Sequence, residues 1–364
     1  MANSGRLRST VAAGLTAAVL AWAVLAWAVP APAAEGAGGA PPSAPAPSAP
    51  APSAPVPAGQ QVPAAGDFAA FLAGVKAEAA AKGIGTVGTG ALDGLQPMDR
   101  VIAMDRKQPE FTLTFAQYLA HVVSPQKVAA GRKMMAENRA LLARIQQRYG
   151  VQPRFVVALW GIESDYGRLM GTFPVVGSLA TLAWDGRRSA YFRGELLDAL
   201  RILDQGHVRP DSMIGSWAGA MGQCQFMPST FLKYAQDFDG DGRRDVWNDR
   251  ADVLASAANY LAGLGWKGDE TWGRAVRLPA RFPDRLTGLE TRKSLADWSR
   301  LGVKGADGRP LPKRRDMQAS LVRAEGDHGP AFLVYDNFRA VMKWNRSTFF
   351  ALAAGHLADK IAHR

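Results

Sequence analysis

The sequence of 364 residues has a single cysteine, Cys224. A lone cysteine excludes an intramolecular disulfide framework and every metal site built from several thiolates. The five histidines are scattered and show no HExxH or comparable spacing, which argues against a zinc hydrolase. A phosphate-binding loop of the GxxxxGK[ST] kind is also missing, which argues against nucleotide chemistry. The remaining class is a protein that uses either no metal or calcium.

Basic residues are missing from a long stretch near the N-terminus, since none occurs between Arg8 and Lys76. Arg6 and Arg8 precede an uncharged apolar run over 11–29, and small residues follow at 31–34. This order predicts a secretory signal peptide over residues 1–34 and a periplasmic or secreted protein. The apolar run is long enough that an uncleaved membrane anchor remains the alternative.

Residues 30–65 hold 11 of the 23 prolines, and almost all the others there are Ala, Gly and Ser. Such a composition cannot build a core and favours polyproline II. We therefore predict a linker over 35–66, followed by one folded domain over 67–364. The linker either holds that domain away from a membrane or is a passive tail.

The folded part is predicted to be mainly helical, with a small β-containing insertion between Trp272 and Arg323 before the last helices. Asp67 and Ser124 are expected helix N-caps, and Pro125 and Pro153 suit the first helical turn. The expected helices cover 67–82, 125–149, 153–167, 189–203, 228–236, 252–264 and 347–361.

The helix that begins at Pro153 carries the strongest chemical signal. Val156, Trp160 and Glu163 share one face, so an acid lies at the end of an apolar stripe. A buried carboxyl must be paired or have a raised pKa, and a raised pKa suits a general acid at neutral pH. The alternative is a solvated or Arg-bonded glutamate at a helix end. Asp165 points to a different face and is a poor second carboxylate.

Residues 215–231, GSWAGAMGQCQFMPSTF, combine three glycines with aromatic and polar side chains. Glycines let a backbone approach a ligand closely, Trp217 and Phe226 offer flat apolar faces, and Ser216 and Gln225 offer hydrogen bonds. This mixture is typical of a site for a sugar or another polyhydroxylated ligand. A tight helix–helix contact cushioned by glycines is the alternative.

Five motifs in one order resemble the lytic murein transglycosylases of the B type. They are WGIESDYG, GSWAGAMGQCQFMPST, the DFDGDG loop, NYL followed by LGW, and VYDNFRAVMKWN. The resemblance implies a lysozyme-like helical core with an additional helical lobe and a small β lobe. It implies cleavage of the β-1,4 bond between N-acetylmuramic acid and N-acetylglucosamine in peptidoglycan, with a 1,6-anhydromuramoyl product.

By the same resemblance, Glu163 acts first as acid and then as base on the C6 hydroxyl of the muramoyl sugar, so no second carboxylate is needed. Ser216, Gln225 and Asn337 are then expected to contact the sugar, and Arg187 and Arg188 to meet the lactyl or peptide carboxylates. The expected aromatic residues of the cleft are Tyr118, Tyr191, Phe226 and Tyr260.

The chain departs from the family pattern at two positions. Cys224 replaces an expected aromatic or apolar residue beside the cleft, where we predict a small buried hydrophobe. Trp344 replaces the usual tyrosine, which should preserve stacking and lose a hydroxyl.

The segment from Asp237 fits the first half of an EF-hand calcium loop. Asp237, Asp239 and Asp241 occupy positions 1, 3 and 5, and Arg243 can offer its carbonyl at position 7. Position 12 is an asparagine, so the resemblance implies a longer loop, 237–252, in which Asp252 is the bidentate ligand. We expect structural Ca²⁺ and no cofactor for catalysis. The alternative is a solvated acidic turn bridged by arginines.

The net charge of +11 favours anionic partners without choosing among wall polymers, nucleic acid and acidic lipid. Export argues against nucleic acid, and a membrane is a partner only if the N-terminal segment stays uncleaved. Peptidoglycan strands are the expected partner, with cell-wall synthesis or division proteins as further candidates. A hydrolytic muramidase of the same fold and a non-catalytic wall-binding protein remain alternative functions.

Overall fold

The computed structural model describes residues 67–107, 113–314, 317–326 and 329–363. The predicted signal peptide and linker lie outside the described residues. Within the described residues, no helix combines the length and apolar character needed to cross a bilayer.

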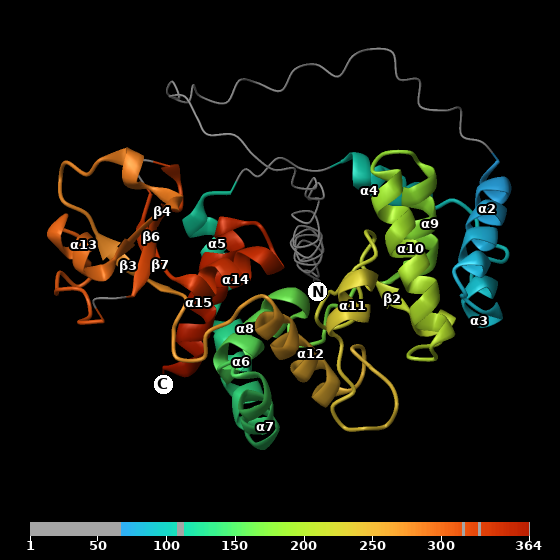
Figure 1. Ribbon diagram of the computed structural model, residues 1–364, viewed down its shortest axis with the longest axis horizontal. Coiled ribbons are helices and arrows are strands. Elements are labelled where there is room, and N and C mark those ends of the chain that lie inside the picture. The colour runs from blue at the N-terminus through green and yellow to red at the C-terminus, as the bar shows by residue number, and fades with distance from the viewer. Residues whose placement is uncertain (1–66, 108–112, 315–316, 327–328, 364) are drawn as a thin grey trace, which may run out of the picture.

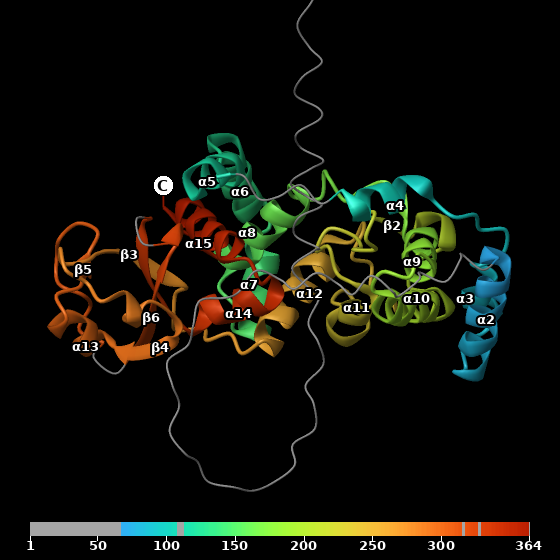
Figure 2. The ribbon, with the colours of Figure 1, turned by 90° about the horizontal axis from the view of Figure 1, so that it is seen from above.

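The described chain is mainly helical, as predicted, and forms three parts along the longest axis (Figures 1 and 2). One end holds α2 (Phe68–Ala81), α3 (Thr86–Gly90), α4 (Asp99–Arg106), α9 (Val175–Trp184) and α10 (Ser189–Asp204). The centre holds α5 (Phe115–Val122), α6 (Pro125–Glu137), α7 (Arg139–Tyr149), α8 (Pro153–Ser164), α11 (Pro228–Tyr234), α12 (Arg250–Gly263), α14 (Asp336–Trp344) and α15 (Thr348–Ala362). The other end holds the β lobe with α13 (Leu295–Arg300).

The β lobe contains one antiparallel sheet in the strand order β4-β6-β7-β3-β5. Its strands are β3 (Gly273–Arg277), β4 (Gly288–Ser294), β5 (Lys304–Gly305), β6 (Gln318–Arg323) and β7 (Ala331–Val334). The lobe has a hydrophobic core of its own around Trp298, Leu321 and Leu333. The predicted β-containing insertion is confirmed, although β7 extends it beyond Arg323. A two-residue pair, β1 (Phe173–Pro174) with β2 (Ile214–Gly215), lies beside α9.

Two predicted helix boundaries are wrong. The expected helix over 125–149 is divided at Asn138, whose buried side chain donates to the carbonyl of Met134 at 2.8 Å and ends α6. The helix from Pro153 ends at Ser164, because Asp165 and Tyr166 adopt left-handed backbone angles, with φ of 51° and 61°. In addition, α9 was not expected: almost every residue in it is buried, so its sequence shows no amphipathic period.

The helix α8 lies at the centre of the main core. Pro153 occupies its first turn, and every residue from Phe155 to Ser164 is buried. It packs against α6, α7, α12 and α15, which surround it. The core therefore fixes the position of the helix that carries Glu163.

Candidate active site

Glu163 lies in the last turn of α8 and is only 2% exposed. Val156 and Trp160, on the same face, are buried as well, so the predicted stripe ending in an acid is confirmed. A carboxyl group in this position is surrounded by protein atoms in place of water. Its charge must therefore be stabilised by partners or removed by protonation.

The carboxyl of Glu163 has one hydrogen-bond donor among the described residues. The Nε1 of Trp344, at the end of α14, donates to Oε1 at 2.8 Å, and Oε2 has no protein partner. Burial raises the pKa of Glu163 to about 8, while the bond from Trp344 opposes that rise. Neither of these causes is another carboxylate. Glu163 is therefore protonated at neutral pH and can deliver a proton from Oε2.

The end of α8 is attached to α6 by Lys127 and Tyr166. Lys127 Nζ donates to the carbonyl of Gly161 at 2.9 Å, and the Tyr166 hydroxyl donates to the carbonyl of Lys127 at 2.7 Å. A Cβ on Gly161 would lie 2.6 Å from the Tyr166 ring, so this close approach requires glycine. Lys127 also forms an ion pair with Asp165 at 3.7 Å. Asp165 thus serves as an anchor of the turn, away from the chemistry of Glu163.

Three aromatic rings surround the donor side of Glu163. The ring of Trp344 lies 4.7 Å from that of Tyr260 and 5.6 Å from that of Phe226, and Phe226 meets Tyr260 edge-on at 5.4 Å. Tyr118, from α5, lies close enough that the charge of Glu163 adds to burial in raising the pKa of its hydroxyl. The structure brings Tyr118, Phe226 and Tyr260 together around the acid.

Residues 216–227 of the glycine-rich segment form an irregular loop, and α11 begins at Pro228. A Cβ on Gly215 would lie 2.1 Å from the carbonyl oxygen of Ala220, and one on Gly222 would lie 2.5 Å from that of Val246. These glycines therefore permit close backbone packing within the protein. The alternative of a helix–helix contact does not describe them, because the close contacts are between loop segments.

Ser216 and Gln225 shape this loop from within. Ser216 is buried, and its hydroxyl accepts from the backbone N–H of Ala220 at 3.0 Å. Gln225 has a left-handed φ of 50°, and its Nε2 donates to the carbonyls of Met170 and Gly222 at 3.1 and 2.8 Å. The side-chain oxygen of Gln225 and the hydroxyl proton of Ser216 are the groups they can offer to a ligand.

Asn337 is fully buried at the start of α14. Its amide donates to the carbonyls of Lys267 and Glu270 at 2.8 and 2.9 Å and accepts from the N–H of Lys267 at 2.7 Å. Both amide protons are used within the protein, where Asn337 ties the loop after α12 to α14. Its side-chain oxygen is the group through which the predicted sugar contact would be made.

Arg187 and Arg188 both bind Asp105, a completely buried carboxylate on α4. Arg187 approaches it at 3.5 Å and stays about half-exposed, whereas Arg188 is mostly covered. Tyr191 follows on α10, where its hydroxyl donates to Glu195. These three residues form one group on the α9–α10 side, and Arg187 is the member most accessible to a ligand.

Cys224 is buried, and its Sγ donates to the carbonyl of Val253 at 3.2 Å. Burial, and then the charge of Glu163, raise the pKa of the thiol well above its usual range. A neutral, buried thiol agrees with the small-hydrophobe role predicted for it.

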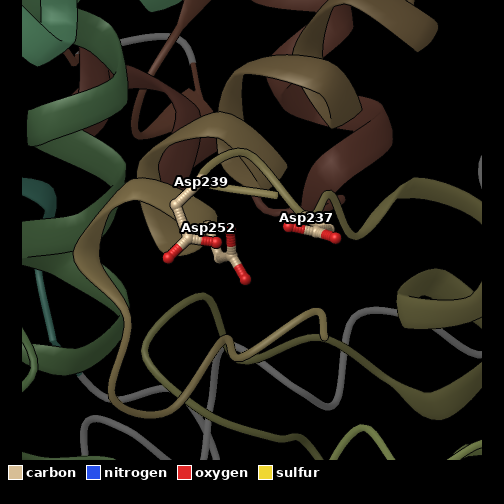
Figure 3. A group of neighbouring side chains, drawn as sticks. All are labelled: Asp237, Asp239 and Asp252. Carbon is tan, nitrogen blue, oxygen red and sulfur yellow. The ribbon is translucent and has the colours of Figure 1, made fainter. Parts of the chain in front are cut away.

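Three carboxylates converge in the loop between α11 and α12, and Figure 3 shows them as a group. One oxygen from each of Asp237, Asp239 and Asp252 lies within 4.8 Å of the others. Asp237 accepts from the N–H groups of Gly240 and Gly242 at 2.7 and 2.9 Å, which bends the loop.

Asp252 accepts from the N–H groups of Phe238 and Asp245 at 2.7 and 2.8 Å. Burial raises its pKa to about 6, and the neighbouring acids Asp249 and Asp239 add to that rise. The cluster includes neither Asp241 nor Arg243. Within the described residues, no ion pair joins an arginine to these three aspartates, so the bridged-turn alternative has no support there. Three hard oxygen ligands in a glycine-bent loop fit Ca²⁺.

Sequence reasoning missed three contributors to the site. The indole of Trp344 was expected only to stack, yet it is the donor to Glu163. Gln223 accepts from Trp160 Nε1 at 2.8 Å and donates to the carbonyl of Trp247 at 2.7 Å, which joins α8 to the acidic loop. Lys127 gave no local signal, because its partner carbonyl is 34 residues away in the chain.

Comparisons with known proteins agree with this arrangement. The family described as transglycosylase SLT domain matches residues 67–359. Membrane-bound lytic murein transglycosylase B of Escherichia coli K12 is 34% identical over 249 residues, which are 68% of this chain and 67% of that protein.

Two solved structures extend the likeness to the fold. SltB3 of Pseudomonas aeruginosa, in complex with NAG-anhNAM-pentapeptide, matches with a TM-score of 0.79 at 46% identity, over 81% of this chain and 80% of that chain. Slt35 of Escherichia coli, in complex with calcium, matches with a TM-score of 0.69 at 30% identity, over 82% and 95%. Together with the buried acid on α8, these likenesses establish that the chain belongs to the transglycosylase SLT-domain family of lytic murein transglycosylases.

Proposed function

We propose that the protein cleaves the β-1,4 bond between N-acetylmuramic acid and N-acetylglucosamine in peptidoglycan and leaves a 1,6-anhydromuramoyl end. The observation that carries this proposal is the environment of Glu163, a buried carboxyl with a pKa near 8, one indole donor, and a free oxygen. A single protonated acid suffices when the nucleophile belongs to the substrate.

The steps follow from that one group. Oε2 of Glu163 gives its proton to the glycosidic oxygen, and the bond to the muramoyl C1 breaks with an oxocarbenium-like charge. The resulting carboxylate then takes the proton of the muramoyl C6 hydroxyl, whose oxygen bonds to C1. Trp344 holds Oε1 through both steps, so the other oxygen stays directed at the reacting atoms. The acid regains its proton, and no water is consumed.

The proposed sugar contacts are the polar groups of the glycine-rich loop and the surrounding aromatic residues. Ser216 and Gln225 bond to the sugar, Arg187 and Arg188 face its carboxylates, and Tyr118, Tyr191, Phe226 and Tyr260 line the cleft. Because the relative from Pseudomonas aeruginosa was solved with a pentapeptide-bearing fragment, we include the stem peptide in the proposed substrate.

Mass spectrometry of muropeptides released from purified sacculi tests this function. The protein is expected to release products one water lighter than those of a muramidase, and Glu163→Gln is expected to release none. Hydrated reducing ends would instead establish the muramidase. Binding to sacculi without release by either protein would establish a wall-binding role.

A structural Ca²⁺ is proposed at the three-aspartate cluster. Asp237, Asp239 and Asp252 would hold it, and the ion would offset the repulsion of carboxylates placed within 4.8 Å of one another. One relative was solved in complex with calcium, which supports this choice of ion. Since Gln223 joins the acidic loop to α8, the ion would stabilise the site without entering the chemistry.

Export through the N-terminal segment is also proposed, because the substrate lies outside the cytoplasm. Fractionation and N-terminal sequencing of the mature protein distinguish the two forms. A new N-terminus after residues 31–34 indicates cleavage, whereas an intact chain in the membrane fraction indicates an anchor.

A further inference from the structure

A cavity of about 390 Å³ opens beside the active site, between α11, α12 and the end of α14. These three helices lie side by side in both views (Figures 1 and 2). The wall of the cavity includes Tyr234 and Tyr260, and three basic residues lie around it: Lys233, Lys343 and Arg346. Among the residues that the structure describes, no acidic one contributes to the wall.

The three basic residues have no acidic partner within the described part of the chain. None of them appears in an ion pair within 4.0 Å, and all three are exposed. Lys233 Nζ lies 5.0 Å from the centre of the Tyr234 ring, and Lys343 donates to the carbonyl of Leu264 at 3.1 Å. Three like charges around one hollow raise the local positive potential and attract an anion.

Two neighbouring aromatic rings connect the wall of the cavity to the acid. Tyr260 forms part of its wall and lies 4.7 Å from the ring of Trp344, which donates to Glu163. The cavity therefore lies on the other side of these rings from the acid at which we propose the glycan strand is cleaved. A neutral sugar chain would make no use of the three positive charges, whereas an anionic group would be attracted by them.

We propose that this cavity binds the carboxylates of the stem peptide carried by the glycan strand. The inference rests on the proposed function and names the part of the substrate that this second site takes. Lys233, Lys343 and Arg346 attract the carboxylates, while Leu264 and Met342 give the peptide an apolar surface. The site thereby prefers strands that retain their peptides over strands from which the peptides have been removed.

Steady-state kinetics on two substrates test this proposal. The triple variant Lys233→Gln, Lys343→Gln, Arg346→Gln is compared with the wild type on peptide-bearing glycan strands and on strands stripped by an amidase. On peptide-bearing strands we expect KM to rise about 5- to 20-fold with kcat unchanged, because the contacts are exposed charge pairs made equally in the ground and transition states. On stripped strands we expect less than a twofold change.

Two further variants separate charge from structure. Lys343→Arg keeps the charge and should keep the wild-type KM. Lys304→Gln, in the exposed strand β5 of the other lobe, removes a lysine elsewhere and should also leave KM unchanged. Strands whose peptide carboxylates are amidated should behave as stripped strands do with the wild-type protein.

An equal rise in KM on both strands, or no rise on either, overturns the proposal. So does wild-type affinity for amidated strands. A binding measurement tests the peptide site without relying on bond cleavage. Glu163→Gln protein should bind a soluble disaccharide-peptide more tightly than the bare disaccharide. The triple variant combined with Glu163→Gln should bind the two ligands equally. If the wild type releases no anhydro product while this difference persists, the proposed function fails and the peptide site stands.

Discussion

Trp344 Nε1, at the end of α14, donates to Glu163 Oε1, in the last turn of α8, at 2.8 Å. The bond is buried, and the two residues are 181 positions apart in the chain. The bond stabilises the ionised carboxylate more than the neutral acid, so it lowers the pKa that burial raises. It also leaves only one oxygen available to the substrate. Trp344 thus fixes the direction of the proposed catalytic group and moderates the acidity that burial gives it.

Replacement of this donor should change the pH dependence of activity. In Trp344→Phe the carboxyl loses the bond, so the pKa of Glu163 should rise above about 8 and the alkaline limb of kcat/KM should move to higher pH. Loss of orientation should also lower kcat about tenfold, the equivalent of one hydrogen bond to a charged group. Trp344→Tyr, with a hydroxyl donor, is the matched comparison. An alkaline limb that stays in place in Trp344→Phe would contradict this account of the bond.

The wild-type enzyme should lose activity as the pH rises through about 8, where Glu163 gives up its proton. Above that value kcat/KM should fall about tenfold per pH unit, since only the protonated form is competent. The measurement is a profile of anhydro-product release from pH 5 to 10 on soluble glycan strands. A profile that is flat across pH 7 to 9 would show that another group donates the proton.

The same carboxyl should make folding stability depend on pH. Its folded pKa of about 8 exceeds the ordinary value of 4.5, so the folded state binds this proton more tightly than the unfolded state. The contribution of Glu163 is therefore most favourable below pH 4.5 and is lost as the pH rises through 8. Glu163→Gln carries no titratable group and should flatten this part of the Tm profile. Thermal unfolding of both proteins over pH 5 to 9 measures the difference, and identical slopes would refute it.

Calcium should stabilise the protein without being needed for the chemical step. At a concentration about 100-fold above Kd, binding to the folded state raises Tm by roughly 5 °C. Asp252→Asn should abolish this rise because Asp252 belongs to the three-carboxylate cluster, whereas Asp241→Asn should retain most of it. Thermal unfolding with chelator and with added Ca²⁺ gives the comparison. If Asp241→Asn lost the Ca²⁺-dependent rise in Tm to the same extent as Asp252→Asn, Asp241 would also be a ligand of the ion.

Replacement of Lys127 should show how much the attachment of α8 to α6 contributes to the free energy of unfolding. Lys127→Met removes the bond to the Gly161 carbonyl and leaves the largely buried Asp165 with one basic partner fewer, so it should destabilise the protein by about 1–3 kcal/mol. Lys133→Met, on the same helix and exposed, should cost less than about 0.5 kcal/mol. Denaturant unfolding of the two variants makes the test. Matching stabilities would mean that the bond to Gly161 contributes nothing.

Much of the site was predictable from local patterns. The apolar stripe ending in Glu163 identified the buried acid, because helical spacing and burial are encoded within a few turns. The three spaced aspartates with Gly242 indicated an acidic loop for the same reason, since turn geometry and ligand type are local properties. The end of α8 at Ser164 was not predictable, because Asp165 is paired with Lys127 of another helix. The break at Asn138 was missed although its side-chain bond to the Met134 carbonyl is local, because the apolar pattern continues across it.

By itself, the sequence determined the mainly helical fold with its small β-containing part, the acid on α8 and the motifs of the family. These depend on composition, spacing and short motifs. The tertiary structure alone decided which groups are in contact. It places Trp344 against Glu163, the Lys267–Glu270 loop against Asn337, and Asp105 against Arg187 and Arg188. It also gathers three basic residues around one cavity, none of them with an acidic partner in the described part of the chain. Contacts of this kind join residues that are far apart in the chain. No local pattern records them, because their energies exist only once the core has packed.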